Sequence, residues 1–169
     1  MPSATIASRT DRTLLVLLIL FSTSELLSAL TDLPSLQIDH THPLPGWRFA
    51  SFVSDARTVL APLIAGAVLA FALWGMLPRA IVAMAALLLV KACAALAWAF
   101  ALRGSSVPLD FLSVQILAPR YVYPLLAIAA LVLLRRGRPG LAGTLVLIPT
   151  GAIWLYWIVV VVLIWTDPD

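Results

Sequence analysis

The sequence predicts an all-α integral membrane protein, a bundle of five transmembrane helices that forms a single polytopic domain over residues 1–169. Hydrophobic residues make up 62% of the chain and charged residues 11%, a balance far from that of soluble domains. The apolar residues gather in long runs, and crossing a bilayer core of about 30 Å takes about 20 helical residues. The predicted spans cover residues 13–31, 59–77, 80–102, 119–135 and 141–165.

The positive charge of the chain does not indicate a nucleic-acid partner. The net charge is +3 and the pI is about 9.6. The arginines, however, stand at the ends of the apolar runs, as residues that flank a membrane do. We therefore exclude nucleic acid and expect the lipid bilayer to surround the protein.

Residues 13–31 form the first apolar run, and Arg9 and Arg12 precede it. A charged start, an apolar centre and small residues from Ser22 onward resemble a secretory signal peptide. We expect this segment to remain as a signal anchor and to serve as the first helix.

Polar residues recur along this first helix at helical spacing: Ser22, Glu25, Ser28 or Ala29, and Asp32. They share one face of the helix, and that face should point toward protein because a charge in lipid is costly.

Lys91 lies near the middle of the third span, where a lysine costs about 2.5–3.5 kcal/mol on insertion scales. Along the helices, Glu25 lies about 18 Å and Lys91 about 16 Å from the starts of their spans. If both helices run outward from one side, the two charges share a depth, so we predict a Glu25–Lys91 pair, direct or bridged by water. We favour a structural role; the alternative is a coupling, substrate or gating site.

Residues 59–77 and 80–102 form the central hairpin, with only Pro78 and Arg79 between them. Proline cannot donate a backbone hydrogen bond and arginine belongs among lipid headgroups, so these two residues predict a tight turn. Small residues three and four apart on both helices predict close packing of their backbones. They include Ala61, Ala65, Ala94 and Ala97.

The polar segment 32–57 predicts an extracytoplasmic loop that ends in a short interfacial helix near residues 47–57. Asp39, His40 and His42 are candidate metal ligands within this loop. A closed zinc site takes four ligands and the chain has no other histidine, so we favour solvated loop residues and predict no metal. Since no histidine lies in a span, membrane-spanning haem held by two histidines of this chain is also not expected, and we predict no cofactor.

Residues 103–120 predict a second extracytoplasmic loop with a short interfacial helix near residues 109–118. Pro119 predicts a break before the fourth span. Arg120 then lies at the membrane interface near Tyr123, which is the interpretation we favour. The alternative is a broken helix whose Arg120 faces a cavity and holds an anionic substrate.

The last span contains Pro149, which favours a kink, and Trp154 and Trp157 near its middle. Aromatic residues at this depth pack between helices, which we favour, or line an apolar pocket. The candidate pocket residues are Trp98, Arg120, Tyr123, Trp154 and Trp157.

Basic residues predict the orientation of the chain in the membrane. Six lie on the side of the N-terminus, Arg79 and the turn at Arg135, and four lie on the opposite side. The positive-inside rule then puts the N-terminus in the cytoplasm and the C-terminus and both long loops outside, most simply in a bacterial plasma or inner membrane.

The layout of the chain is loosely similar to that of the tryptophan-rich sensory (translocator) proteins. The likeness covers the helix count and the last span, which runs from Arg138 through Pro149 to Trp154 and Trp165. The first loop has only Trp47, where that family is rich in tryptophan and proline. The resemblance implies small-molecule or lipid binding within the membrane.

The chain has no glycine-rich phosphate loop, no Ser-His-Asp set and no HExxH motif, and little of it lies outside the membrane. We therefore predict a non-catalytic accessory or assembly subunit of a larger membrane complex, with other membrane subunits or further copies of itself as partners. The alternatives are a small-molecule or lipid binding or transport protein with an intramembrane pocket, and a lipid-modifying enzyme that uses Glu25 and Lys91 as acid and base.

Overall fold

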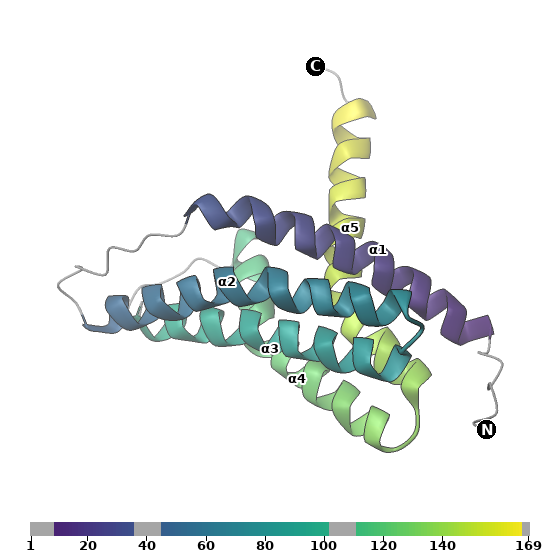
Figure 1. The fold of residues 1–169 in the computed structure, drawn as a ribbon. Coiled ribbons are helices and arrows are strands. Elements are labelled where there is room, and N and C mark those ends of the chain that lie inside the picture. The colour runs from purple at the N-terminus through teal and green to yellow at the C-terminus, as the bar shows by residue number, and fades with distance from the viewer. Residues whose placement is uncertain (1–8, 36–44, 102–110, 167–169) are drawn as a thin grey trace.

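A computed structural model describes residues 9–35, 45–101 and 111–166, which are helical apart from two short turns (Figure 1). The elements are α1 (Arg9–Asp32), a 3₁₀ turn η1 (Leu33–Ser35), α2 (Pro45–Leu73), α3 (Leu77–Ala101), α4 (Phe111–Arg135) and α5 (Pro139–Thr166).

The described helices confirm the predicted fold class. Four of them, α1, α2 from Gly46 onward, α3 and α5, are each long and apolar enough to cross a membrane, and no strand occurs among the described residues. The protein is therefore a multi-pass membrane protein built as an all-α bundle. The fourth predicted span, residues 119–135, forms the later part of α4, and its crossing of the membrane stays a prediction.

Residues 47–57, predicted as a separate interfacial helix, are instead the first part of α2. The helix runs without interruption from Pro45 to Leu73, with Pro62 inside it. Polar and aromatic side chains at residues 47–57 do not interrupt the backbone hydrogen bonds, because neither proline nor glycine occurs among them. The predicted loop at residues 32–57 is correspondingly shorter.

The predicted break at Pro119 is also wrong, because α4 is one helix from Phe111 to Arg135. Each proline removes one backbone hydrogen bond, and packing against neighbouring helices makes that loss tolerable in a membrane protein. The described part of the predicted interfacial helix near residues 109–118 therefore belongs to α4, and the loop at residues 103–120 is shorter than predicted.

The turn of the central hairpin lies at residues 74–76, before Pro78 and Arg79 rather than at them. Gly75 has a φ of 72°, its N–H donates to Ala72 O at 3.0 Å, and the Met76 N–H donates to Phe71 O at 2.8 Å. This is a Schellman ending, in which glycine takes the left-handed conformation that side chains disfavour. Pro78 is then the second residue of α3, where its missing N–H costs nothing.

The turn between α4 and α5 repeats the same ending. Gly137 has a φ of 70°, its N–H donates to Leu134 O at 3.0 Å, and the Arg138 N–H donates to Leu133 O at 3.0 Å. The basic turn predicted here is confirmed, and Figure 1 shows it at the same end of the bundle as the α2–α3 turn and the start of α1.

α3 lies at the centre of the fold and contacts all four of the other long helices. It supplies half of the largest fully buried side chains among the described residues, namely Ile81, Met84, Leu87 and Leu88. The predicted small-residue packing is seen as well: Ala61, Ala65, Ala94 and Ala97 are buried. In lipid, where water exclusion does not drive helices together, such close contacts supply the attraction.

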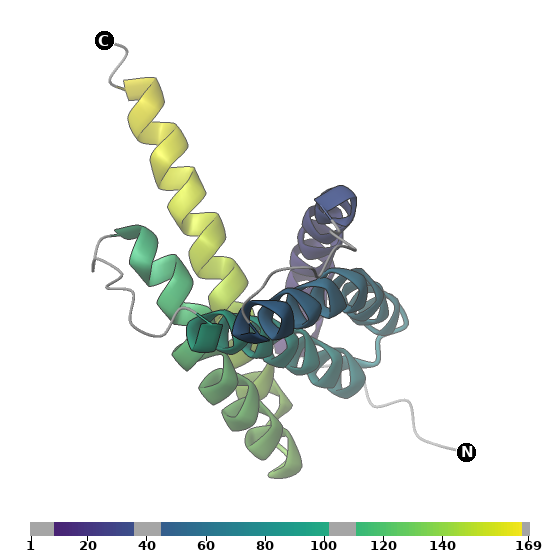
Figure 2. The ribbon, with the colours of Figure 1, turned by 90° about the vertical axis from the view of Figure 1, so that its left-hand side faces the viewer.

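α5 packs against the bundle through its first half. A Cβ atom at Gly143 would lie 3.2 Å from Leu14 of α1 and 3.5 Å from Ile81 of α3, so the three helices approach closely there. The second half, Leu155–Thr166, is called the α5 arm below. Figures 1 and 2 both show it standing clear of the other helices, and its side chains are exposed or half-buried.

Replacing Gly143 with leucine should separate α5 from α1 and α3 at their closest approach and lower the free energy of unfolding by about 1–3 kcal/mol. The matched control is Gly140→Leu, because nothing lies within 4 Å of a Cβ atom at Gly140. Unfolding of both variants in detergent micelles checks this, and equal stability of the two would contradict the close packing of α5.

Candidate functional site

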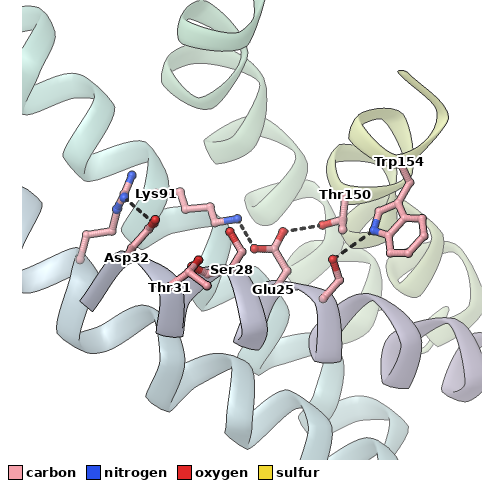
Figure 3. Close-up of polar contacts among 9 residues, drawn as sticks. Glu25, Ser28, Thr31, Asp32, Lys91, Thr150 and Trp154 are labelled. Carbon is pink, nitrogen blue, oxygen red and sulfur yellow. Dashed lines mark hydrogen bonds and ion pairs between the residues drawn. The ribbon is translucent and has the colours of Figure 1, made fainter. Parts of the chain in front are cut away.

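A cluster of polar side chains lies where α1, α3 and α5 meet (Figure 3). The Lys91 ammonium of α3 forms an ion pair and hydrogen bond with Glu25 Oε2 of α1. The Thr150 hydroxyl of α5 donates to the other carboxylate oxygen, Glu25 Oε1, at 3.0 Å. One carboxylate thus joins three helices, and the pair that the helix depths predicted is present.

Both charged side chains of this ion pair are mostly buried. The side chain of Glu25 is 12% exposed and that of Lys91 is 24% exposed. Tyr123 of α4 is buried as well. A low-dielectric environment strengthens the attraction between the two charges and makes either of them costly on its own.

The sequence of α1 places Glu25 on the face that points into the bundle. Ser22 and Ala29 of the predicted polar face are buried, whereas Ser28 is exposed. The Ser22 hydroxyl donates to Ile19 O of its own helix at 3.2 Å, so it is satisfied without a partner from another helix. Helical spacing therefore aligned the inward face correctly.

At the C-terminal end of α1, Asp32 forms a second ion pair, with Arg57 of α2, at 3.4 Å. The sequence did not predict this partner for either residue. Both side chains are more than a third exposed, so the pair contributes little to stability, about 0–1 kcal/mol.

Three residues of the cluster were not predicted from the sequence: Thr150, Ser24 and Phe21. The Trp154 Nε1–H of α5 donates to Ser24 Oγ at 3.2 Å, and its ring stacks on Phe21 with centroids 6.3 Å apart. A threonine in an otherwise apolar stretch, directly after Pro149, was the available signal for Thr150. Ser24 and Phe21 carry no such signal, because only the placement of α5 against α1 selects them.

The other candidate pocket residues lie in different surroundings. Trp98 of α3 packs edge-on against Trp47 of α2, with ring centroids 5.3 Å apart. Trp154 packs between α5 and α1, as the favoured interpretation expects. Trp157 is 57% exposed on the α5 arm, and the described helices do not enclose it. Trp98, Trp154 and Trp157 therefore do not enclose one pocket.

Arg120 of α4 is half-buried, and its guanidinium carbon lies 5.6 Å from the centroid of the Tyr121 ring. The proposed metal ligands Asp39, His40 and His42 lie outside the described residues. Among the described residues, no group of three or more potential metal-ligating side chains comes together.

The Glu25 carboxylate receives hydrogen bonds on both oxygens, from an ammonium and from a hydroxyl. Chemically, such an arrangement joins helices. The outward-facing residues around it, Ser24 and Trp154, bond to each other. The geometry thus favours a structural joint over an open substrate site.

The chain matches no family profile, no curated protein and no solved structure with significance.

Proposed function

We propose that the protein is a non-catalytic accessory or assembly subunit of a larger membrane complex. The observation that carries this proposal is the α5 arm, an apolar helical segment most of whose side chains are exposed. The polar cluster supports it indirectly, because its groups bond to one another and hold the base of the arm in place.

The α5 arm is apolar on every side. Its residues are almost all tryptophan, isoleucine, leucine, valine and tyrosine, and Leu155 is 64% exposed while Trp165 is 82% exposed. A helix that projects alone into lipid gains no contacts with other helices, and such contacts are what stabilise helical membrane proteins. An apolar transmembrane helix of another subunit, or of a second copy, would supply them.

The base of the arm is held firmly. Thr150 and Trp154 both hydrogen-bond to α1, and Gly151 lies against Phe21, with 3.5 Å between the nearest ring atom and a Cβ atom at Gly151. A rigid base fixes the direction of the arm and lowers the entropy lost when a partner binds. We also infer that the N-terminus lies in the cytoplasm, because the basic residues gather at that end of the bundle.

Site-specific photo-crosslinking in native membranes tests the proposal. A photoreactive residue at Leu155, Ile158 or Val162, which share one face of the arm, should give a discrete protein adduct of defined mass. The matched control is Leu125 of α4, which is similarly exposed, at 68%, but lies on another face of the protein. The mass of the adduct separates a second copy of this chain from a different subunit. Labelling of lipid alone at all four positions would overturn the proposal.

A second candidate function is small-molecule or lipid binding within the membrane. The observation in its favour is that Glu25, Lys91 and Thr150, from three different helices, come together in one polar cluster. Under that function, Thr150→Val should weaken the binding of a small molecule or lipid. An intramembrane enzyme that uses Glu25 and Lys91 as acid and base is the third; activity retained in Lys91→Met would eliminate it.

A further inference from the structure

An open groove on the bundle combines apolar walls with one charged side chain, that of Arg79. The groove lies between the start of α3 and the end of α4, and Figure 1 shows these two helices inclined to each other. Its other lining residues are all apolar: Phe71, Pro78, Val82, Ala83, Ala86 and Leu134. A ligand that fits this groove is therefore apolar along most of its length and negatively charged at one end.

The groove follows one face of α3 from the end of the helix inward. The residues of this face are Arg79, Val82, Ala83 and Ala86. Their spacing of three and four residues aligns them along the helix. At 1.5 Å per residue the face extends about 10 Å from Arg79 to Ala86. The two alanine side chains fill little space, which leaves room beside them for an elongated apolar group.

The charged end of the groove lies at the boundary of the membrane. α2 from Gly46 onward and α3 are each long and apolar enough to cross a bilayer, and a short turn joins them. From Arg79 to its end at Ala101, α3 rises about 33 Å, which already exceeds the roughly 30 Å of a hydrocarbon core. The whole span thus lies on one side of Arg79. Trp74 in the turn is 69% exposed, as aromatic residues at membrane interfaces are.

The guanidinium of Arg79 has no acidic partner in the described part of the chain. The side chain is exposed, and it donates a hydrogen bond to Met76 Sδ at 3.4 Å. The ion pairs of the described helices join other residues. A thioether sulfur is a weak acceptor and carries no charge, so the positive charge of Arg79 is left for an external anion.

The charge around the groove is complementary to an anion. Arg135 and Arg136, both exposed, directly follow the lining residue Leu134. Neither aspartate nor glutamate occurs in residues 56–109 or 111–166, so α3, α4 and α5 supply no carboxylate here. Basic sites between transmembrane helices commonly bind anionic lipid headgroups.

We propose that the groove binds one anionic phospholipid, with its phosphate at Arg79 and an acyl chain along Val82 and Ala86. The inference does not depend on the proposed function. A guanidinium offers paired N–H groups to the oxygens of a phosphate. The apolar face that continues from Arg79 into the membrane favours a lipid over a free anion, which would leave that face unused.

Native mass spectrometry of the full-length protein tests the site. The protein in detergent is mixed with equal amounts of phosphatidylglycerol and phosphatidylcholine that have identical acyl chains, and the two single-lipid adducts are compared. The wild-type protein should favour phosphatidylglycerol about fivefold or more, the ratio typical of one basic residue at an anionic membrane surface. Arg79→Gln should reduce that ratio about fivefold.

A matched control separates this site from general attraction of charge. Arg12→Gln removes an exposed arginine from the start of α1, at the same end of the bundle. Because α1 contributes no residue to the groove, this variant should keep the wild-type ratio.

A second pair of variants tests the apolar part of the groove. Ala86→Phe places a ring in the groove and should lower the fraction of protein that carries either lipid. Its control is Ala99→Phe, the same change at a half-buried alanine about 20 Å further along α3, which should leave that fraction unchanged. Val82→Phe, at a position that is 46% exposed, replaces Ala86→Phe if the latter does not fold.

Four results would overturn the proposal. A wild-type ratio in Arg79→Gln would leave this arginine as an ordinary anchor of the helix end. An equal reduction in Arg12→Gln would show unspecific attraction to the basic end of the bundle. Displacement of phosphatidylglycerol by an equal amount of glycerophosphoglycerol, the same headgroup without acyl chains, would assign the site to a free anion. An unchanged lipid fraction in the folded phenylalanine variant of the groove would mean that no acyl chain lies there.

Discussion

Replacing Lys91 with methionine should lower the free energy of unfolding by about 3–5 kcal/mol, the cost of leaving one member of a buried ion pair without its partner. Methionine is unbranched and only one atom shorter than lysine, so the change removes the charge and little of the packing. Glu25 would retain only the hydrogen bond from Thr150 at 3.0 Å. Unfolding in mixed detergent micelles, together with the amount of protein that accumulates in membranes, measures the loss.

The double variant Lys91→Met, Glu25→Gln separates the ion pair from the rest of the cluster. With both charges removed, much of the stability should return, because a buried pair contributes less than the cost of breaking it. Arg57→Gln is the control, since it breaks the exposed pair with Asp32 and should cost about 0–1 kcal/mol. A Lys91→Met protein as stable as wild type would show that Glu25 and Lys91 do not hold α1 to α3.

Replacing Ile81 with alanine should lower the free energy of unfolding by about 2–5 kcal/mol, because it opens a cavity that the surrounding helices cannot fill. Ile81 is fully buried in the second turn of α3, and its Cδ1 lies 3.5 Å from the position of a Cβ atom at Gly143 on α5. The same unfolding assay in detergent measures the loss. The effect should extend to α5. Proteolysis of the α5 arm, or labelling of a cysteine introduced into it, should therefore become faster.

The neighbouring residue provides the control. Val82 is 46% exposed on the same helix, so Val82→Ala removes apolar atoms that face the membrane rather than the core. Its effect should stay within about 0.5 kcal/mol, as for exposed positions generally. Similar losses in the two variants would mean that α3 is not the centre of the packed bundle.

Much of this architecture was predictable because a bilayer imposes simple requirements on a sequence. The length of apolar runs identified the helices, and the same 1.5 Å rise per residue that sets their length placed Glu25 and Lys91 at one depth. The inward face of α1 followed from helical spacing. The ends of helices were less predictable: Pro78 was taken as the turn, whereas Gly75 makes it, because a φ of 72° suits glycine.

The polar residues in the first part of α2 and the prolines in α4 produced errors of the same kind. A change in polarity at Arg57, or a proline at position 119, indicates where a helix can stop. Whether it stops depends on the contacts that its next turn makes. Packing of α2 on α3 and of α4 on α3 and α5 accounts for helices that continue through these points.

The sequence by itself determined that the protein is a helical membrane protein, which residues face inward on α1, and which two charges meet. Only the tertiary structure decided that Thr150 binds the second carboxylate oxygen, that Trp154 bonds to Ser24, and that the α5 arm stands apart from the bundle. The physical reason is that helical periodicity and depth are properties of one helix at a time. The direction in which α5 crosses its neighbours depends on how the side chains of several helices, such as Leu14 and Ile81 around Gly143, fill space together.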